Sequence, residues 1–320
     1  MIRKTFVMSL LLALSAVSLY AAPPSARDLV VAGRIDDAVT MLRSRLTANP
    51  QDAEAYHLLG RAYYSIQRWD DSIRNGERAV ALQPNNSDYH LWLGRAYGEK
   101  ADSSSFLTAA ELAKKVRTQF ELAVQLNPTN FSARSDLSEY YIGAPGFLGG
   151  GKDKARAQAD QIANGDPSTS HWIRAAIAEK DKNYAIAEQE LKQSIQSSKV
   201  PSKRWLDLAS FYRRRSRFNE MEQAINTAVN VPGREPNVLY DAAEILSRAG
   251  RNFTGAVQML RSYLNSGDPS DDAPLFQAHY LLGTILEKTG DRSGAAQEYR
   301  ASLSLARDFE KAQSALKRVQ

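Results

Sequence analysis

The stretch Leu59-Gly60-Arg61-Ala62-Tyr63 decides the fold, because it recurs 34 residues later as Leu93-Gly94-Arg95-Ala96-Tyr97. A third copy of the spacing, Trp205-x-x-Leu208-Ala209-x-x-Tyr212, lies further along the chain. A period of 34 residues is typical of helical repeats, in which each helix pair buries its apolar face against the next pair. The sequence therefore predicts an all-α solenoid.

Small residues support the same register, since seven repeats can be aligned with Gly, Ala or Ser at the eighth position. These residues are Gly60, Gly94, Ser138, Ala175, Ala209, Ala243 and Gly283. The two helices of a pair are expected to touch there, and a larger side chain would push their backbones apart. Three positions later, four of the repeats have a large aromatic residue: Tyr63, Tyr97, Tyr141 and Tyr212.

This pattern resembles the tetratricopeptide repeat (TPR) family, whose repeat has Leu at position 7, a small residue at 8, an aromatic at 11 and Pro at 32. The resemblance implies a right-handed superhelical solenoid of about seven to eight helix pairs plus a C-terminal capping helix, over residues 23–319. The expected pairs are residues 25–50, 53–86, 87–128, 131–167, 168–199, 202–235, 236–268 and 276–307, with the capping helix at 308–319. Ser25 is expected to cap the first helix and Asp308 the last.

Three departures interrupt this repeat pattern. Extra residues occur at 98–108, and a glycine-rich insertion at 143–151 separates the helices of the third pair. The fourth repeat has Arg174 where the family has leucine and Ala178 where it has an aromatic residue.

The first 22 residues have the three-part layout of a cleavable signal peptide. Arg3 and Lys4 form a basic start, an apolar stretch runs over residues 6–17, and small residues end at Ala22. The apolar run is short against the roughly 20 residues that span a bilayer. We therefore expect export to the bacterial periplasm or beyond, cleavage between residues 18 and 22, and no stable membrane span afterwards.

Composition excludes several classes of chemistry. The 320 residues include no cysteine and four histidines, with a net charge of +5. Disulfides, thiolate metal sites and cysteine nucleophiles are therefore impossible, and the mild basic surplus is unlike that of a dedicated nucleic-acid binder. We expect no catalytic centre, no metal, no cofactor and no nucleic-acid partner. The sequence leaves the oligomeric state open.

The segment Gly146-x4-Gly151-Lys152 has the spacing of a phosphate-binding loop. Its context differs, because the preceding residues have helical spacing and Asp153 stands where Ser or Thr would hold magnesium. We interpret the segment as a long turn with a helix start, and expect no nucleotide binding there.

In the TPR family, positions 2, 5, 9, 12 and 13 of the first helix face the concave groove. The resemblance therefore makes ten residues candidates for ligand binding: His57, Arg61, Tyr64, Arg95, Trp172, Arg213, Arg214, Tyr240, Arg248 and Tyr280. Arginine and aromatic residues dominate the energetics of many interfaces. Such a face favours acidic, extended ligands, although long arginines on an amphipathic helix can also simply be solvated. The basic run Lys203–Arg217 has the same two interpretations, an anionic partner or a solvated helix end.

These features predict a non-enzymatic scaffold that binds a protein or peptide, including an acidic one, in its concave groove. The lysines and asparagines of the family's chaperone-binding clamp are not reproduced, because His57 and Arg61 stand at two of those positions. The alternative is an accessory subunit of an envelope assembly or export machine that docks through its outer surface.

Overall fold

The computed structural model describes residues 23–320, which form 17 α-helices, one 3-10 turn and no β-strand. The first four pairs are α1 (Ala26–Val31) with α2 (Ile35–Ala48), α3 (Ala53–Ser65) with α4 (Trp69–Leu82), α5 (Ser87–Asp102) with α6 (Phe106–Leu126), and α7 (Phe131–Gly143) with α8 (Lys152–Ile162). The next four are α9 (Pro167–Lys180) with α10 (Tyr184–Ser197), α11 (Ser202–Arg214) with α12 (Phe218–Val229), α13 (Val238–Ala249) with α14 (Phe253–Leu264), and α15 (Leu275–Lys288) with α16 (Arg292–Leu305). A final helix, α17 (Glu310–Val319), follows the last pair.

The helices of each pair approach most closely at the small residue of the repeat. A β-carbon added to Gly94 would lie 2.6 Å from the ring of Phe120 on the partner helix, and one added to Gly283 would lie 2.7 Å from Tyr299. Ser138 and Ala209, at the same repeat position, have no exposed surface. Close backbone contact inside each pair therefore explains why these positions are small.

The short turns inside the pairs share one backbone feature. Gln67, Lys182, Ser216, Gly250 and Gly290 all have a positive φ and lie at the same place in their repeats. The left-handed conformation reverses the chain within three residues and is unfavourable for residues other than glycine. The two repeats with insertions use longer connections instead.

The insertion at 98–108 lengthens the second pair. Helix α5 continues to Asp102, and α6 starts at Phe106 and runs for 21 residues. Its first two residues, Phe106 and Leu107, are each 76% exposed. The insertion therefore extends both helices and places apolar side chains in solvent.

The insertion at 143–151 forms the 3-10 turn Gly146–Leu148, which carries the exposed Phe147. Helix α7 precedes this turn, and Lys152 forms an ion pair with Asp181. The segment is therefore a long turn between two helices. Its lysine has a partner within the chain.

Capping of the first helix is confirmed, because the Ser25 hydroxyl accepts a hydrogen bond from the Asp28 amide at 3.2 Å. The expectation for Asp308 is wrong. Phe309 occupies the N-cap position of α17, and the carboxylate of Asp308 pairs with Arg68 at 3.0 Å. No helix within residues 23–320 combines the length and the apolar character needed to cross a bilayer.

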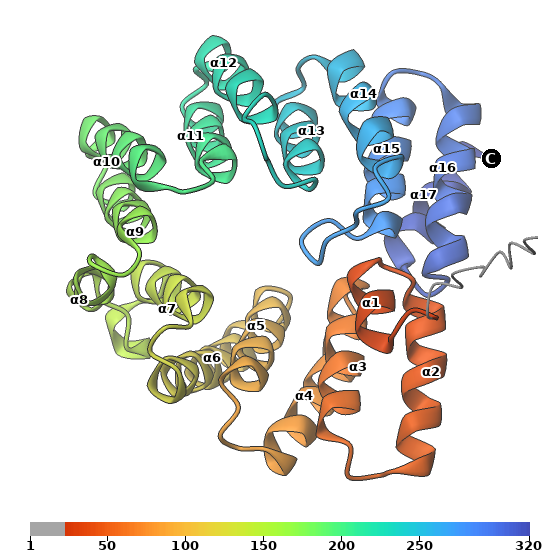
Figure 1. The fold of residues 1–320 in the computed structure, drawn as a ribbon, viewed down its shortest axis with the longest axis horizontal. Coiled ribbons are helices and arrows are strands. Elements are labelled where there is room, and N and C mark those ends of the chain that lie inside the picture. The colour runs from red at the N-terminus through yellow and green to blue at the C-terminus, as the bar shows by residue number, and fades with distance from the viewer. Residues whose placement is uncertain (1–22) are drawn as a thin grey trace, which may run out of the picture.

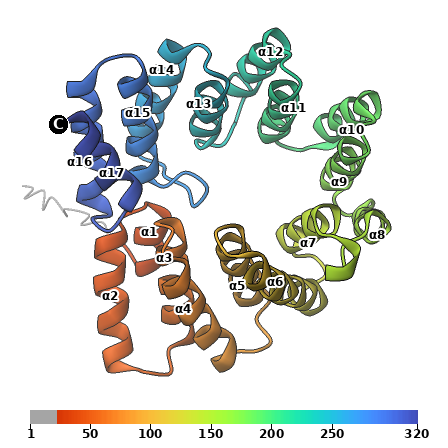
Figure 2. The ribbon, with the colours of Figure 1, turned by 180° about the vertical axis from the view of Figure 1, so that it is seen from behind.

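The stack of pairs curls until its two ends meet, so that the all-α superhelix closes into a ring (Figure 1). The view from behind shows the same contact of α1 and α2 with α15–α17 (Figure 2). One hydrophobic cluster spans the junction. It joins Leu29, Ile35 and Leu58 from the N-terminal helices to Phe276 and Phe309 near the C-terminus.

Polar contacts reinforce the junction. The Leu275 amide donates to the Ala32 carbonyl at 3.2 Å, and the Gln277 side chain donates to the Ser65 carbonyl at 2.9 Å. Arg307 pairs with Asp36 at 3.1 Å. Because the terminal pairs cover each other, the ring has no open solenoid end at this junction.

Candidate functional site

The first helix of each pair faces the centre of the ring (Figure 1), and we call this surface the inner face. Three neighbouring cavities open on this face, with volumes of about 490, 320 and 550 Å³. Arg95 lines all three, while Arg61 lines the second and third. Their sizes fall in the range that accommodates small ligands or the side chains of a bound segment.

Two arginines one repeat apart hold a tryptophan between them. The guanidinium carbons of Arg61 and Arg95 lie 4.5 and 4.8 Å from the ring centroid of Trp92. We call this group the arginine–tryptophan stack. Equivalent positions on successive helices place the arginines side by side, and the electron-rich indole ring favours both cations.

Both arginines of the stack already have carboxylate partners. Arg61, only 7% exposed, pairs with Asp271, and Arg95 donates from Nε to Asp136 at 2.6 Å. Burial alone would lower the pKa of Arg95, but the adjacent Asp136 outweighs it and raises that pKa. The stack is therefore charged and neutralised within the chain.

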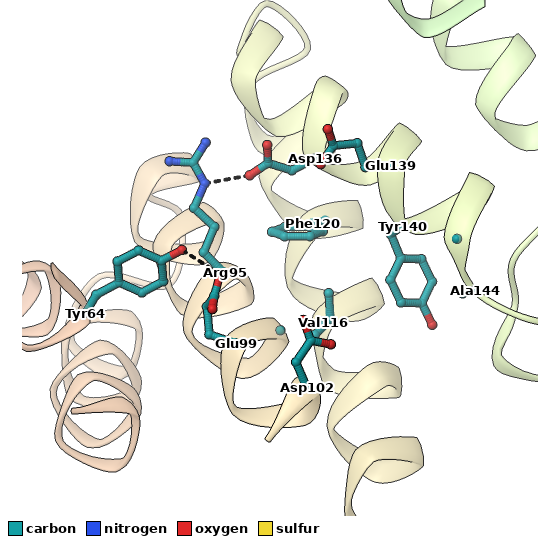
Figure 3. Close-up of a pocket in the computed structure, with 12 residues that line it drawn as sticks. Tyr64, Arg95, Glu99, Asp102, Val116, Phe120, Asp136, Glu139, Tyr140 and Ala144 are labelled. Carbon is teal, nitrogen blue, oxygen red and sulfur yellow. Dashed lines mark hydrogen bonds and ion pairs between the residues drawn. The ribbon is translucent and has the colours of Figure 1, made fainter. Parts of the chain in front are cut away.

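The first cavity is an acidic pocket bounded by α3, α5, α6 and α7 (Figure 3). Tyr64 and Tyr140 stand on opposite sides, and Phe120 and Val116 lie between them. Its charged lining residues are Arg95 and four acids, Glu99, Asp102, Asp136 and Glu139. With Asp136 held by Arg95, three carboxylates remain without an ion-pair partner among the described residues. The pocket is suited to a cation.

The acids of the inner face influence one another. The surrounding helices remove part of the water from Glu139, and this desolvation, with the nearby Asp136, raises the pKa of that carboxyl. Burial together with Asp272 and Glu244 raises the pKa of Asp241 to about 7, against the opposing effect of Lys203. Burial also raises the pKa of Asp207, despite its partner Arg204. Acids from α7, α11 and α13 therefore share one electrostatic field.

Most of the arginines predicted to bind an acidic ligand already have a carboxylate partner in the chain. Besides Arg61 and Arg95, Arg214 pairs with Glu179 at 2.7 Å and Arg248 with Glu244 at 2.8 Å. Arg213 has no ion pair among the described residues, but it does not line the three cavities. Neighbouring acids compensate these charges within the chain.

The basic run 203–217 is compensated in the same way. Lys203 pairs with Asp272 at 3.4 Å, Arg204 with Asp207 at 2.9 Å, and Arg217 with Glu188 and Glu220. Arg215 lies 4.1 Å from the ring centroid of Tyr184. The run therefore gives little support to an anionic partner.

Several predicted aromatic or histidine site residues pack inside the protein. His57 is 5% exposed and stacks on Tyr89, and its burial lowers its pKa to about 3. Tyr240 is buried beside Tyr263. His57 and Tyr240, both predicted to bind a ligand, therefore fill spaces between helices in the structure.

Trp172 and Tyr280 contribute mainly to packing. Trp172 packs against the apolar clusters on both of its sides, with Arg204 5.9 Å from its ring. Tyr280 lies edge to face with Phe309 at 5.2 Å, at the ring junction. Of the ten predicted residues, the cavities bring together only Arg61, Tyr64 and Arg95.

Sequence reasoning missed Trp92, Glu99, Asp102 and Asp271. Trp92 lies between two arginines at matching repeat positions, which is a usable signal. Asp271 and Asp272 fall in residues 269–275, which no expected repeat included. Such an acidic stretch outside the register marks a segment that the repeat pattern cannot place.

Among residues 23–320, no three histidine, aspartate or glutamate side chains gather as they would around a metal ion. The site instead offers charged and aromatic surfaces for non-covalent binding.

Two models of a known protein family match parts of this sequence. A tetratricopeptide repeat model matches residues 25–86 and again 57–110, and a second such model matches residues 276–309. The chain therefore contains tetratricopeptide repeats near both of its ends.

One curated relative is the mouse superkiller complex protein 3, which is 20% identical over 281 residues. The match covers 87% of this chain but spans only 17% of the mouse protein. Solved structures with a similar course include a tetratricopeptide repeat protein from Parabacteroides merdae, with 14% identity and a TM-score of 0.43, covering 84% of this chain and 99% of that one. A TPR protein from Thermus thermophilus has 18% identity and a TM-score of 0.43, covering 70% and 100%.

Proposed function

We propose that this TPR protein is a non-enzymatic scaffold of the bacterial cell envelope that holds an extended segment of a partner protein on its inner face. TPR repeats generally form protein-interaction scaffolds, and their fold typically has no enzymatic role. The observation that carries the proposal is the acidic pocket, where charged and aromatic side chains remain available after the helices have packed. Binding requires only such a fixed surface.

The acidic pocket favours a basic side chain of the partner. Glu99 and Asp102 supply negative charge, and the faces of Tyr64 and Tyr140 suit a lysine or arginine. A partner with a basic side chain fits better than the purely acidic ligand expected from the sequence, because the cavities are lined by more acidic than basic residues. An acidic residue of the same segment would instead contact the arginine–tryptophan stack.

A direct test compares Glu99→Gln/Asp102→Asn with the control Glu111→Gln/Asp153→Asn, which removes the same charges outside the cavities. Labelled peptide libraries of equal length, with a central Arg, Glu or Ala, serve as probes. Arg peptides should bind the wild type best, and only the pocket variant should lose them, by about tenfold. Equal losses from both variants would reject the pocket.

Export is part of the same proposal, and its signal lies in residues 1–22, outside the described residues. The basic, apolar and small regions support removal of this leader in a bacterial envelope. Intact-mass measurement on protein from the native cell tests it. A product that still begins at Met1 would overturn it.

A second candidate is an accessory subunit of an envelope assembly or export machine. The exposed Phe106, Leu107 and Phe147 favour it, since each exposes more than 70% of its surface outside the cavities. Replacing all three with Ser should then abolish co-purification with the membrane complex while peptide binding persists. Unchanged co-purification would reject this candidate.

A further inference from the structure

Residues 265–274 connect α14 to α15 and extend from the ring wall towards the inner face (Figure 1). We call them the acidic loop, because they contain Asp268, Asp271 and Asp272 and no basic residue. The loop lines the second and third cavities. Part of the surface suited to a partner is therefore covered by the chain itself.

The shape of the acidic loop is fixed by a buried tyrosine. The Tyr263 hydroxyl, on a side chain that is 1% exposed, donates to the Ala273 carbonyl and accepts from the Ser270 amide at 3.1 Å. The Ala273 amide also donates to the Ser270 carbonyl at 3.1 Å. Asp271 and Asp272 are thereby held at the tip of a tight turn.

The tip binds two cations of the inner face. Asp271 forms an ion pair with Arg61, and Asp272 lies 3.4 Å from the amino group of Lys203. Arg61 needs a carboxylate more than Lys203 does, because a nearly buried guanidinium without one would be strongly unfavourable. Asp271, still 39% exposed, can leave the site more easily than Arg61 can.

We propose that the acidic loop is an intramolecular ligand, which occupies the site where an acidic segment of the partner protein binds Arg61 and the arginine–tryptophan stack. The loop shows the chemistry of that occupant, two adjacent carboxylates at the tip of a turn with prolines on either side. Tethering gives the loop an effective concentration of the order of millimolar, so a free segment binds weakly until the loop is released. This inference rests on the proposed use of the inner face.

The partner segment then carries two kinds of charge. Its acid replaces Asp271 at Arg61, and its basic side chain enters the acidic pocket, since Tyr64 and Arg95 line both the first and second cavities. A segment with both anchors gains enough contacts to compete with the loop. A segment that carries only the acid has a single contact with which to displace the loop.

The probe is a fluorescent synthetic peptide with the loop's own sequence, residues 265–274, titrated into the chain without its leader. Asp271→Asn/Asp272→Asn should bind it at least tenfold more tightly than the wild type, because the tethered competitor is lost. Asp268→Asn is the matched control, since it removes one charge from the same loop without touching Arg61 or Lys203. It should behave as the wild type does.

Adding Arg61→Ala to the double variant should abolish the new binding. Lys203→Ala removes the exposed contact of Asp272 and leaves the ion pair of Arg61 with Asp271 in place, so it should give an intermediate affinity. Equal peptide affinity in the wild type and the double variant would overturn the proposal. Binding that survives Arg61→Ala would overturn it as well.

Hydrogen exchange of the loop amides separates this proposal from the proposed function. The double variant should exchange faster over residues 265–274, while the Arg-peptide test of the acidic pocket stays independent of the outcome. A released loop without peptide binding would refute the intramolecular ligand and leave the acidic pocket standing. A loop that exchanges as slowly as in the wild type would refute it too.

Discussion

At the residue scale, the protein depends on a few positions where backbones or charges come unusually close. Gly94 allows α5 to contact α6, and Arg61 is almost enclosed between Trp92 and Asp271. A second glycine close to Gly94 in the sequence has a different environment. Gly98 lies one turn after Gly94, yet a β-carbon there would meet Val116 at 3.9 Å, an ordinary contact distance.

These two glycines give a prediction about stability. Gly94→Ala should lower the free energy of unfolding by about 1–3 kcal/mol, because Phe120 has to move. Gly98→Ala should leave it unchanged or raise it by up to about 1 kcal/mol, since alanine favours helix over glycine. Urea denaturation of both variants checks this. Equal destabilisation would mean that the close contact between α5 and α6 is absent.

The raised pKa of Asp241 predicts a pH dependence. Its value is about 7 in the folded protein, against an ordinary 3.8, so between these values the folded state holds a proton that the unfolded chain has lost. The free energy of unfolding therefore falls as pH rises from about 4 to 7. Asp241→Asn should make this slope shallower, with the remainder coming from Glu139, and should be about 1–2 kcal/mol more stable than the wild type at pH 8.

The measurement is the denaturation midpoint at several pH values. Asp153→Asn, which removes an exposed carboxylate, should keep the wild-type slope. An Asp241→Asn profile that parallels the wild type across this range would contradict the assignment.

At the element scale, the two insertions act differently although both interrupt a helix pair. The first lengthens α5 and α6, while the second forms a compact turn whose end returns to α7 through a hydrogen bond from the Gly151 amide to the Tyr141 carbonyl at 2.8 Å. Within that turn, Gly150 lies so close to Ala144 that a β-carbon would stand 1.8 Å from the Ala144 carbonyl oxygen. Ala144 borders the acidic pocket.

Gly150→Ala should therefore open this turn. We expect faster hydrogen exchange over residues 143–151 and a lower melting temperature, because the new methyl group cannot fit against the backbone. Gly146→Ala is the control, since a β-carbon there has no neighbour within 4 Å. Identical exchange in the two variants would show that the turn is not packed as described.

At the scale of the whole molecule, closure of the ring decides where the inner face lies. Gly33 sits at the junction with φ +72°, and a β-carbon there would lie 2.6 Å from Pro274, at the end of the acidic loop. Gly250 has a similar φ of +66° but no neighbour within 4 Å. The two glycines thus share the same backbone strain on substitution, and only one also contacts the opposite end of the chain.

Gly33→Ala should loosen the ring, whereas Gly250→Ala should lose only the stability that a left-handed alanine costs, about 1 kcal/mol. Small-angle scattering should show a larger radius of gyration for Gly33→Ala alone. Hydrogen exchange should rise in α1 and at the start of α15 in the same variant. Unchanged scattering and exchange would mean that the junction tolerates the methyl group.

The helix pairs follow from the amino-acid sequence alone, because the 34-residue period and the small residues at Gly60 and Gly94 are local requirements of two helices in contact. The sequence also placed Arg61 and Arg95 on the same face, one repeat apart. Only the tertiary structure decided that the two ends join, since Phe276 and Phe309 meet Ile35 across nearly the whole length of the chain. The same closure brings Asp271 to Arg61, and so occupies a site that the repeat pattern left open. Curvature accumulates from small rotations between successive pairs, and no single motif encodes that sum.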